Sequence, residues 1–143
     1  EAEKIISTHT ETSSFALIDS VTELNLSKSL AIVQQLKKQN EEPIALLALL
    51  SSQIRLILQC KLLKQKGYQE QQIAKYLQVH PFAVKMALRR ERLFTSQQLK
   101  SMLIEATNTD EGLKTGKEPW LTLEFFIRSI ISIKLNDQLK QYI

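Results

Sequence analysis

The chain has 143 residues, the length of one domain, and carries 19 Lys and Arg against 15 Asp and Glu, a formal charge of +4. With three Gly, three Pro and one Cys, it lacks the residues that a β-sandwich, a glycine-loop nucleotide fold or a disulfide scaffold requires. We therefore expect an all-α fold, a single bundle of about six or seven helices. The mild basic excess permits an acidic partner without requiring one.

The apolar residues recur at helical spacing, and Ser, Pro and Gly mark the ends of the periodic segments. Ser14 and Ser27 are interpreted as N-caps of the first two helices, and Pro43 as the first-turn residue of a third, longest helix that ends at Gly67. The expected helices cover residues 14–23, 27–39, 43–66, 69–77, 81–92, 95 toward 113, and 119 to at least 135.

The polar residues 1–13 are interpreted as a linker, the tail of a preceding domain, and residues 14–143 as the helical domain. Because the chain begins without Met, we expect it to be a piece of a longer protein. The single Cys60 lies in an apolar run, as is typical of a reduced, cytoplasmic protein. We expect no membrane span of about 18 apolar residues, because polar side chains interrupt the most hydrophobic region: Gln53, Arg55, Gln59 and Lys61.

The titratable residues form no pattern that indicates an enzyme. His9 lies in the polar leading segment, and His80 precedes Pro81, where a turn residue at a helix start is the simplest interpretation. One Cys and two separated His supply no zinc ligand set, and no glycine-rich phosphate loop is present. We predict no catalytic, cofactor or metal site in this chain.

Residues 73–85 resemble the helix-turn-helix of bacterial regulators. Four basic residues on or just after the second helix would suit contacts with DNA: Lys85, Arg89, Arg90 and Arg92. However, Gln78 stands where regulators usually have Gly, and Phe82 occupies a position expected to read bases. The alternative is that two small helices pack on a long one and the basic run is a solvated face. Both interpretations stay open at this point.

The order of segments resembles the C-terminal domain of the delta subunit of bacterial DNA polymerase III, over nearly the whole chain. The resemblance rests on segments at matching spacing: Phe15-Ala16-Leu17-Ile18-Asp19, Leu30-Ala31, residues 41–50, Gln53-Ile54-Arg55, Ile73-Ala74, His80 to Lys85, Phe94-Thr95, Asp110, Lys114-Thr115-Gly116 and Leu123-Glu124. It implies a collar domain that assembles the clamp-loader pentamer in DNA replication, with gamma/tau and delta-prime type subunits as partners. It also implies that the sliding clamp is bound only through an N-terminal domain that this sequence lacks.

A collar role requires apolar surface for neighbouring subunits, and the last expected helix is the best source of it. Its large apolar residues do not fit one narrow stripe, and Arg55 interrupts the apolar run of the third helix. We therefore predict a partner interface that includes Arg55, Trp120, Phe125, Phe126 and Ile130. The alternative is that the apolar members of this set fill the core.

Overall fold

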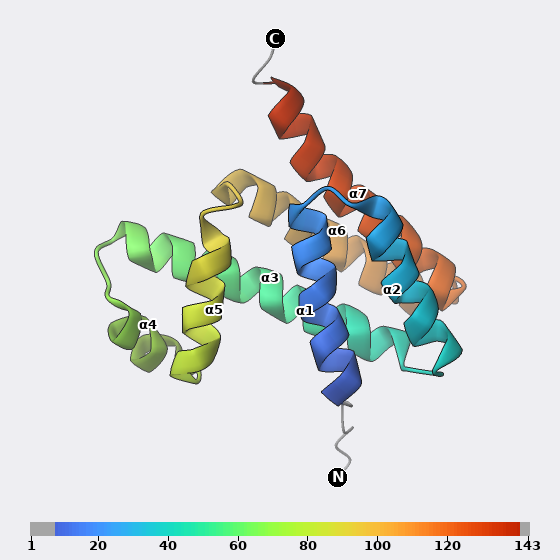
Figure 1. Ribbon diagram of the computed structural model, residues 1–143, viewed down its shortest axis with the longest axis horizontal. Helices are drawn as coiled ribbons and strands as arrows, with labels where there is room; N and C mark the ends of the chain where they lie inside the picture. The colour runs from blue at the N-terminus through green and yellow to red at the C-terminus, as the bar shows by residue number, and fades with distance from the viewer. Residues whose placement is uncertain (1–7, 141–143) are drawn as a thin grey trace.

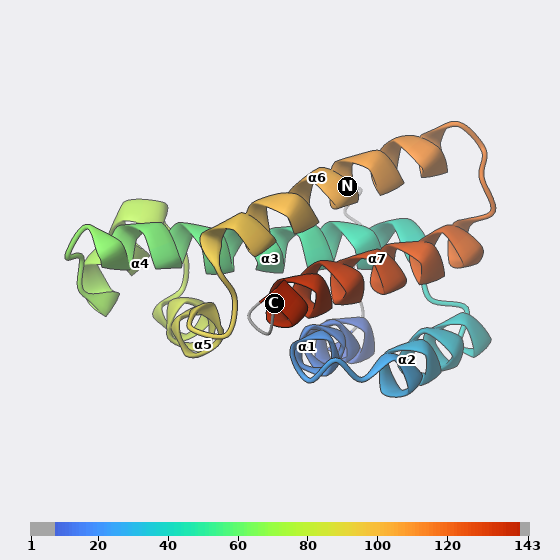
Figure 2. The ribbon, with the colours of Figure 1, turned by 90° about the horizontal axis from the view of Figure 1, so that it is seen from above.

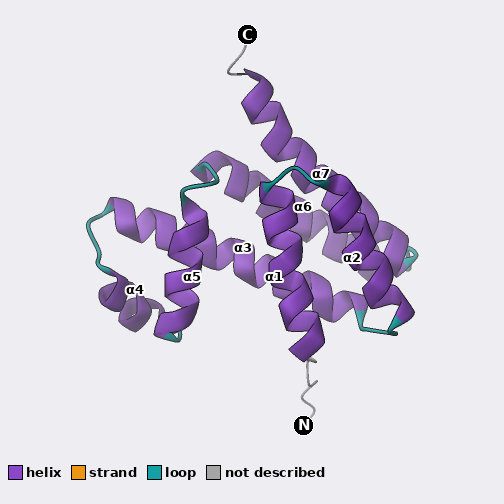
Figure 3. Cartoon of the chain, in the orientation of Figure 1, coloured by secondary structure: helices purple, strands orange, loops and turns teal. Residues whose placement is uncertain are grey.

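The chain folds into seven α-helices, which confirms the all-α prediction (Figure 3). The computed structural model describes the backbone of residues 8–140 and the side chains of residues 10–136, and this part of the chain contains no strand. The helices are α1 (Thr8–Thr22), α2 (Leu26–Lys38), α3 (Pro43–Gln65), α4 (Glu70–Leu77), α5 (Pro81–Glu91), α6 (Ser96–Lys114) and α7 (Pro119–Lys140).

The longest helix, α3, runs through the middle of the molecule (Figure 1). Pro43 occupies its first turn, where a missing N–H costs nothing, and Gly67 follows its end with a φ of 94°, which favours glycine. Helix α3 contacts α1, α4, α5, α6 and α7. Its apolar residues lie on several sides because its neighbours surround it.

The other helices form two groups around α3 (Figure 2). Helices α6 and α7 pack against each other and against α3, while α1 and α2 form a pair that covers α7. Helices α4 and α5 pack together at the end of α3 that leads into them. One continuous apolar core joins the two groups, and its largest fully buried side chains are Phe126, Leu17, Leu36, Leu46, Leu50, Ile54, Ile73, Leu99, Met102, Leu123, Ile127 and Ile130.

The predicted start of the first helix is wrong, because α1 begins at Thr8 and Ser14 lies inside it. Ser14 is buried, its hydroxyl donates to the Glu11 carbonyl at 2.7 Å, and it accepts from Gln53 Nε2 of α3 at 2.6 Å. Thr10, inside the expected linker, is also buried, and its hydroxyl donates to the Glu41 carboxylate. Residues 1–7 of the expected linker lie outside the described residues.

The second helix also begins earlier than predicted. The side chain of Asn25, not that of Ser27, accepts a hydrogen bond from the backbone N–H of Lys28 at 3.0 Å. Ser27 is therefore a first-turn residue of α2 and not its N-cap. Thr95 is the N-cap of α6: its hydroxyl accepts from the Gln98 N–H at 3.0 Å, and the Gln98 side-chain oxygen accepts from the Thr95 N–H at 2.8 Å.

Helix α3 is long and apolar enough to cross a membrane, contrary to the sequence-based expectation. It has 23 residues, and its most apolar 18-residue window has a mean hydropathy of 1.5. The polar residues that interrupt the helix still leave the mean hydropathy of this window high enough for a membrane span. Core helices of globular domains have the same composition, and α3 packs against five other helices of this bundle.

Candidate interaction surfaces

The five residues of the predicted partner interface occupy different environments. Phe126 and Ile130 are each 1% exposed and belong to the core of this chain, so they present no surface to another protein. Trp120 is half-buried and packs against the same core. Phe125 is 59% exposed, and Arg55 is exposed on α3.

Leu121 joins Phe125 on the outer side of α7, a neighbour that the sequence analysis did not select. The two residues are four positions apart, so their side chains lie on one side of the helix, and both are more than half exposed. They line a hollow of about 460 Å³ between α6 and α7, with Glu105 and Asn108 opposite them on α6. We call Leu121 and Phe125 the α7 face. It is an apolar patch that the bundle leaves uncovered.

The predicted helix-turn-helix forms as two helices, α4 and α5, joined by a short turn. Gln78 ends α4 with a φ of 58°, the left-handed conformation that glycine would adopt without strain. His80 caps α5, and its Nδ1 accepts the N–H of Phe82 at 3.0 Å. The turn residue predicted at His80 is therefore an N-cap.

The four basic residues proposed for DNA contact also separate. Arg90 turns inward, where its Nε lies 2.8 Å from Asp19 Oδ1 and its Nη2 lies 3.2 Å from Asp19 Oδ2 of α1. Its guanidinium also lies 5.3 Å from the ring centre of Phe15. Lys85, Arg89 and Arg92 are exposed, so three of the four point to solvent.

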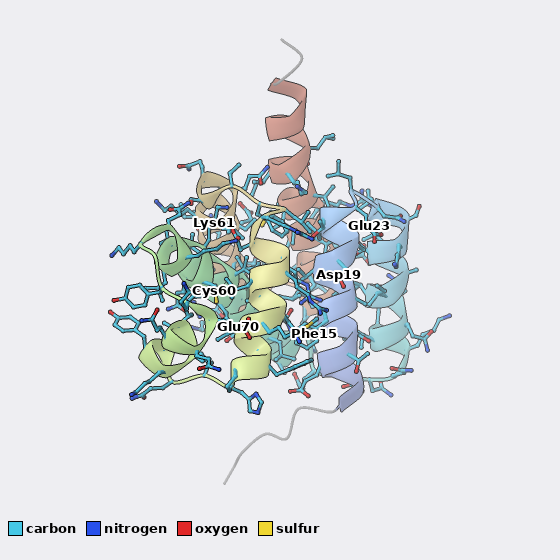
Figure 4. All side chains as sticks on the ribbon, turned by 60° about the vertical axis from the view of Figure 1, so that its left-hand side comes forward. Phe15, Asp19, Glu23, Cys60, Lys61 and Glu70 are labelled. Carbon is cyan, nitrogen blue, oxygen red and sulfur yellow. The ribbon has the colours of Figure 1, made fainter. Side chains whose placement is uncertain are left out.

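A groove lies between α1, α3 and α5, and the sequence analysis did not find it. Its volume is about 420 Å³, and the side chains that line it are mainly apolar: Phe15, Leu49, Leu56, Ile57, Val79, Phe82, Ala83, Met86 and Ala87. Helix α3 forms its floor, and α1 and α5 form its walls, with Phe15 and Asp19 on the side of α1 that faces α5 (Figure 4). We call it the α1–α5 groove. No short motif could reveal it, because three separate helices supply the lining.

Glu91, a buried carboxylate at the end of α5, is the centre of a charged cluster. Its carboxylate lies 3.1 Å from Lys61 Nζ and 2.9 Å from Lys64 Nζ, both on α3. Burial raises the pKa of Glu91, but the hydrogen bonds and charges of Lys64 and Lys61 outweigh this and hold the pKa below its ordinary value. The cluster fastens the end of α5 to α3, which is a structural role.

The Cys60 thiol is completely buried beside this cluster. Burial, with a smaller contribution from the charge of Glu91, raises the pKa of Cys60 to about 11. The thiol is therefore protonated at neutral pH, and its environment is that of a structural cysteine. Among residues 10–136, no three His, Cys, Asp or Glu side chains come together as metal ligands could.

Comparison with known proteins identifies the fold and the family. The sequence model of the DNA polymerase III delta subunit, C-terminal domain, matches residues 11–130. The chain is 39% identical over 132 residues to DNA polymerase III subunit delta of Bacillus subtilis, covering 92% of this chain and 38% of that protein. It also resembles the solved Bacillus subtilis DNA clamp loader delta protein, with a TM-score of 0.80 and 41% identity over 86% of this chain and 37% of the other.

These matches do not support the interpretation as a DNA-binding regulator. They extend over α1 to α7, so the helix-turn-helix segment is one part of a larger domain. The chain belongs to the family formed by the C-terminal domains of DNA polymerase III delta subunits.

Proposed function

We propose that this domain assembles a clamp loader for DNA replication in the cytoplasm, by packing in a collar with the corresponding domains of other subunits. The curated relative is a DNA polymerase III subunit, and the solved relative is a DNA clamp loader protein. The partners would be clamp-loader subunits of the gamma/tau and delta-prime type. The chain spans only 38% of the curated relative, so contact with the sliding clamp is assigned to the remaining part of such a protein.

The α7 face is the observation that carries this proposal. Leu121 and Phe125 expose a leucine and an aromatic side chain side by side, although the same helix buries Phe126 and Ile130 completely. Large apolar side chains of this kind act as anchors in protein interfaces, because covering them removes apolar area from water. A second chain packed on α6 and α7 would cover them.

The experiment is co-elution of this chain with the other clamp-loader subunits from the same organism. We expect the wild-type chain to form a complex, and Leu121→Asp and Phe125→Asp to weaken it at least 10-fold, because each places a charge in an apolar contact. Ile44→Asp is the matched control, since Ile44 is 54% exposed at the start of α3 and lines neither the hollow beside the α7 face nor the α1–α5 groove. Circular dichroism verifies that each variant is folded.

Two results would contradict this proposal in different ways. If the wild-type chain does not co-elute with any of the other loader proteins at tens of micromolar, the assembly function is wrong. If the complex forms but the two α7 variants bind as tightly as the wild type, the assembly surface lies elsewhere and the α7 face is not part of it.

A further inference from the structure

The α1–α5 groove has walls that are fixed in the folded chain. The bidentate ion pair between Arg90 and Asp19 joins α5 to α1, and Arg90 also stacks on Phe15. These contacts join the two walls, and both α1 and α5 also pack on α3, which forms the floor. A ligand therefore meets a preformed surface and does not have to organise it.

The lining of the groove suits apolar side chains. Phe15 and Phe82 are large, exposed aromatic residues on opposite walls, and Leu56 of the floor and Met86 of α5 add further apolar surface. Its volume of about 420 Å³ is within the ordinary range of ligand sites, roughly 300–1,000 Å³. Methionine adds an adaptable, polarisable contact.

Two arginines lie at the edge of this apolar lining. Arg55 reaches the groove from α3, is exposed, and forms no hydrogen bond or ion pair with the residues that the structure describes. Arg89 is exposed next to the groove, and its Nη1 lies 3.9 Å from the sulfur of Met86. Of the two carboxylates near the groove, Asp19 is paired with Arg90, which leaves Glu11.

The charge distribution of the whole chain points the same way. Eight of the 19 Lys and Arg residues, but two of the 15 Asp and Glu residues, lie between Lys61 and Arg92, so this segment carries +6 whereas the chain carries +4. The α4–α5 end of the molecule is therefore basic and the remainder is slightly acidic. An acidic partner is attracted to this end.

An apolar groove with a basic rim is complementary to an amphipathic helix that has acidic flanks. Such helices place apolar side chains at positions i, i+4 and i+7 into a groove and leave the flanking residues at its rim. A nucleic acid fits less well, because its phosphates would meet the apolar walls instead of a surface of cations. We infer that the α1–α5 groove docks an acidic amphipathic helix of another protein chain, with Arg55 and Arg89 facing its carboxylates. This inference rests on the proposed function in one respect, that the helix belongs to another member of the clamp loader.

The first test uses a synthetic probe and the 143-residue chain. The probe, the Glu peptide, is a labelled 18-residue helical peptide with Leu on one face and Glu on the flanks. The control, the Lys peptide, has Lys in place of every Glu. Fluorescence anisotropy is expected to show binding of the Glu peptide, at least 10-fold tighter than the Lys peptide. Absence of binding, or equal affinity for both peptides, overturns the inference.

Two variants locate the binding. Ala83→Glu places a longer, negative side chain in the groove, and Arg55→Glu reverses a charge at its rim. Each is therefore expected to lower the affinity for the Glu peptide at least 10-fold. Lys100→Glu is the matched control, because Lys100 is exposed on α6 and does not line the groove. Unchanged affinity of Ala83→Glu, in a variant with wild-type thermal unfolding, overturns the inference.

Other occupants give distinguishable results. Displacement of the Glu peptide by a short DNA duplex would assign the groove to nucleic acid, and concentration-dependent self-association that Ala83→Glu abolishes would assign it to a second copy of this chain. Each result overturns the inference. If Ala83→Glu and Arg55→Glu still co-elute with the loader subunits, only the inference about the groove is wrong. If the wild-type chain itself does not co-elute with them, the proposed function is wrong.

Discussion

Arg90 of α5 and Asp19 of α1 form a bidentate ion pair, although 71 residues separate them in the sequence. The side chain of Arg90 is 11% exposed and that of Asp19 is 48% exposed, so the pair is half open to water. This pair and the stacking of Arg90 on Phe15 join α1 directly to α5.

Replacing Arg90 with Ala is expected to lower the free energy of unfolding by about 1 kcal/mol, because it removes the pair and the packing on Phe15. Urea unfolding at pH 7 measures the change. Arg89→Ala is the control at the adjacent, exposed position and should change the free energy by less than about 0.5 kcal/mol. Equal effects of the two substitutions would show that the pair contributes nothing.

Glu91→Gln is expected to lower the free energy of unfolding at pH 7 by about 1–3 kcal/mol, because Lys61 and Lys64 lose their buried carboxylate. Since the pKa of Glu91 is lowered in the folded chain, its stabilising contribution is complete above the unfolded pKa of about 4.3 and is lost as the pH falls through the folded pKa.

Urea unfolding of both proteins between pH 7 and pH 3 tests this dependence. The difference between wild type and Glu91→Gln should decrease as the pH falls below about 5. Glu111→Gln, at an exposed position of α6, is the control and should show only a small difference at every pH. A difference for Glu91→Gln that is constant across the range would contradict the lowered pKa.

Phe125 and Phe126 are adjacent in α7, but they should respond differently to truncation. Phe126→Ala is expected to lower the free energy of unfolding by about 3–5 kcal/mol, because it leaves a cavity in the core. Phe125→Ala should lower it by less than about 0.5 kcal/mol. Thermal and urea unfolding measure both. A large cost for Phe125→Ala in the isolated chain would show that this side chain supports the fold.

Gln78→Gly is expected to raise the free energy of unfolding by about 0.5 kcal/mol, because glycine adopts a φ of 58° without strain and Gln78 is exposed. Gly67→Ala is the complementary test. A Cβ added at Gly67 would meet no atom within 4 Å. A decrease of about 1 kcal/mol in the free energy of unfolding would therefore be due to the φ of 94° alone. If neither substitution changes urea unfolding, the left-handed conformations are not strained.

The helices that the sequence predicted well are those with strong end signals. Pro43, Thr95 and Pro119 lie at the starts of α3, α6 and α7, and glycines follow the ends of α3 and α6, as expected. The predicted start of α1 was wrong because the first two turns of this helix are polar. Thr10 and Ser14 are buried there through hydrogen bonds with Glu41 and Gln53, which are tertiary contacts that apolar periodicity does not detect.

The interaction surfaces were less predictable than the fold. The composition of α7 indicated surplus apolar residues, but Phe125 and Phe126 are equivalent in sequence, and only the position of α7 against α2 and α6 separates the exposed one from the buried one. The pairing of Arg90 with Asp19 requires α1 and α5 to be placed in space. The position of an arginine in a basic run of the sequence therefore does not predict which residue it contacts.

Helix α7 packs against α1 and α2, so the first helices of the domain are covered by the last one. During synthesis on the ribosome, the sides of α1 and α2 that face α7 remain uncovered until α7 has emerged. The core of this domain therefore closes only after α7 has been synthesised, and interruption of synthesis before α7 leaves an aggregation-prone nascent chain.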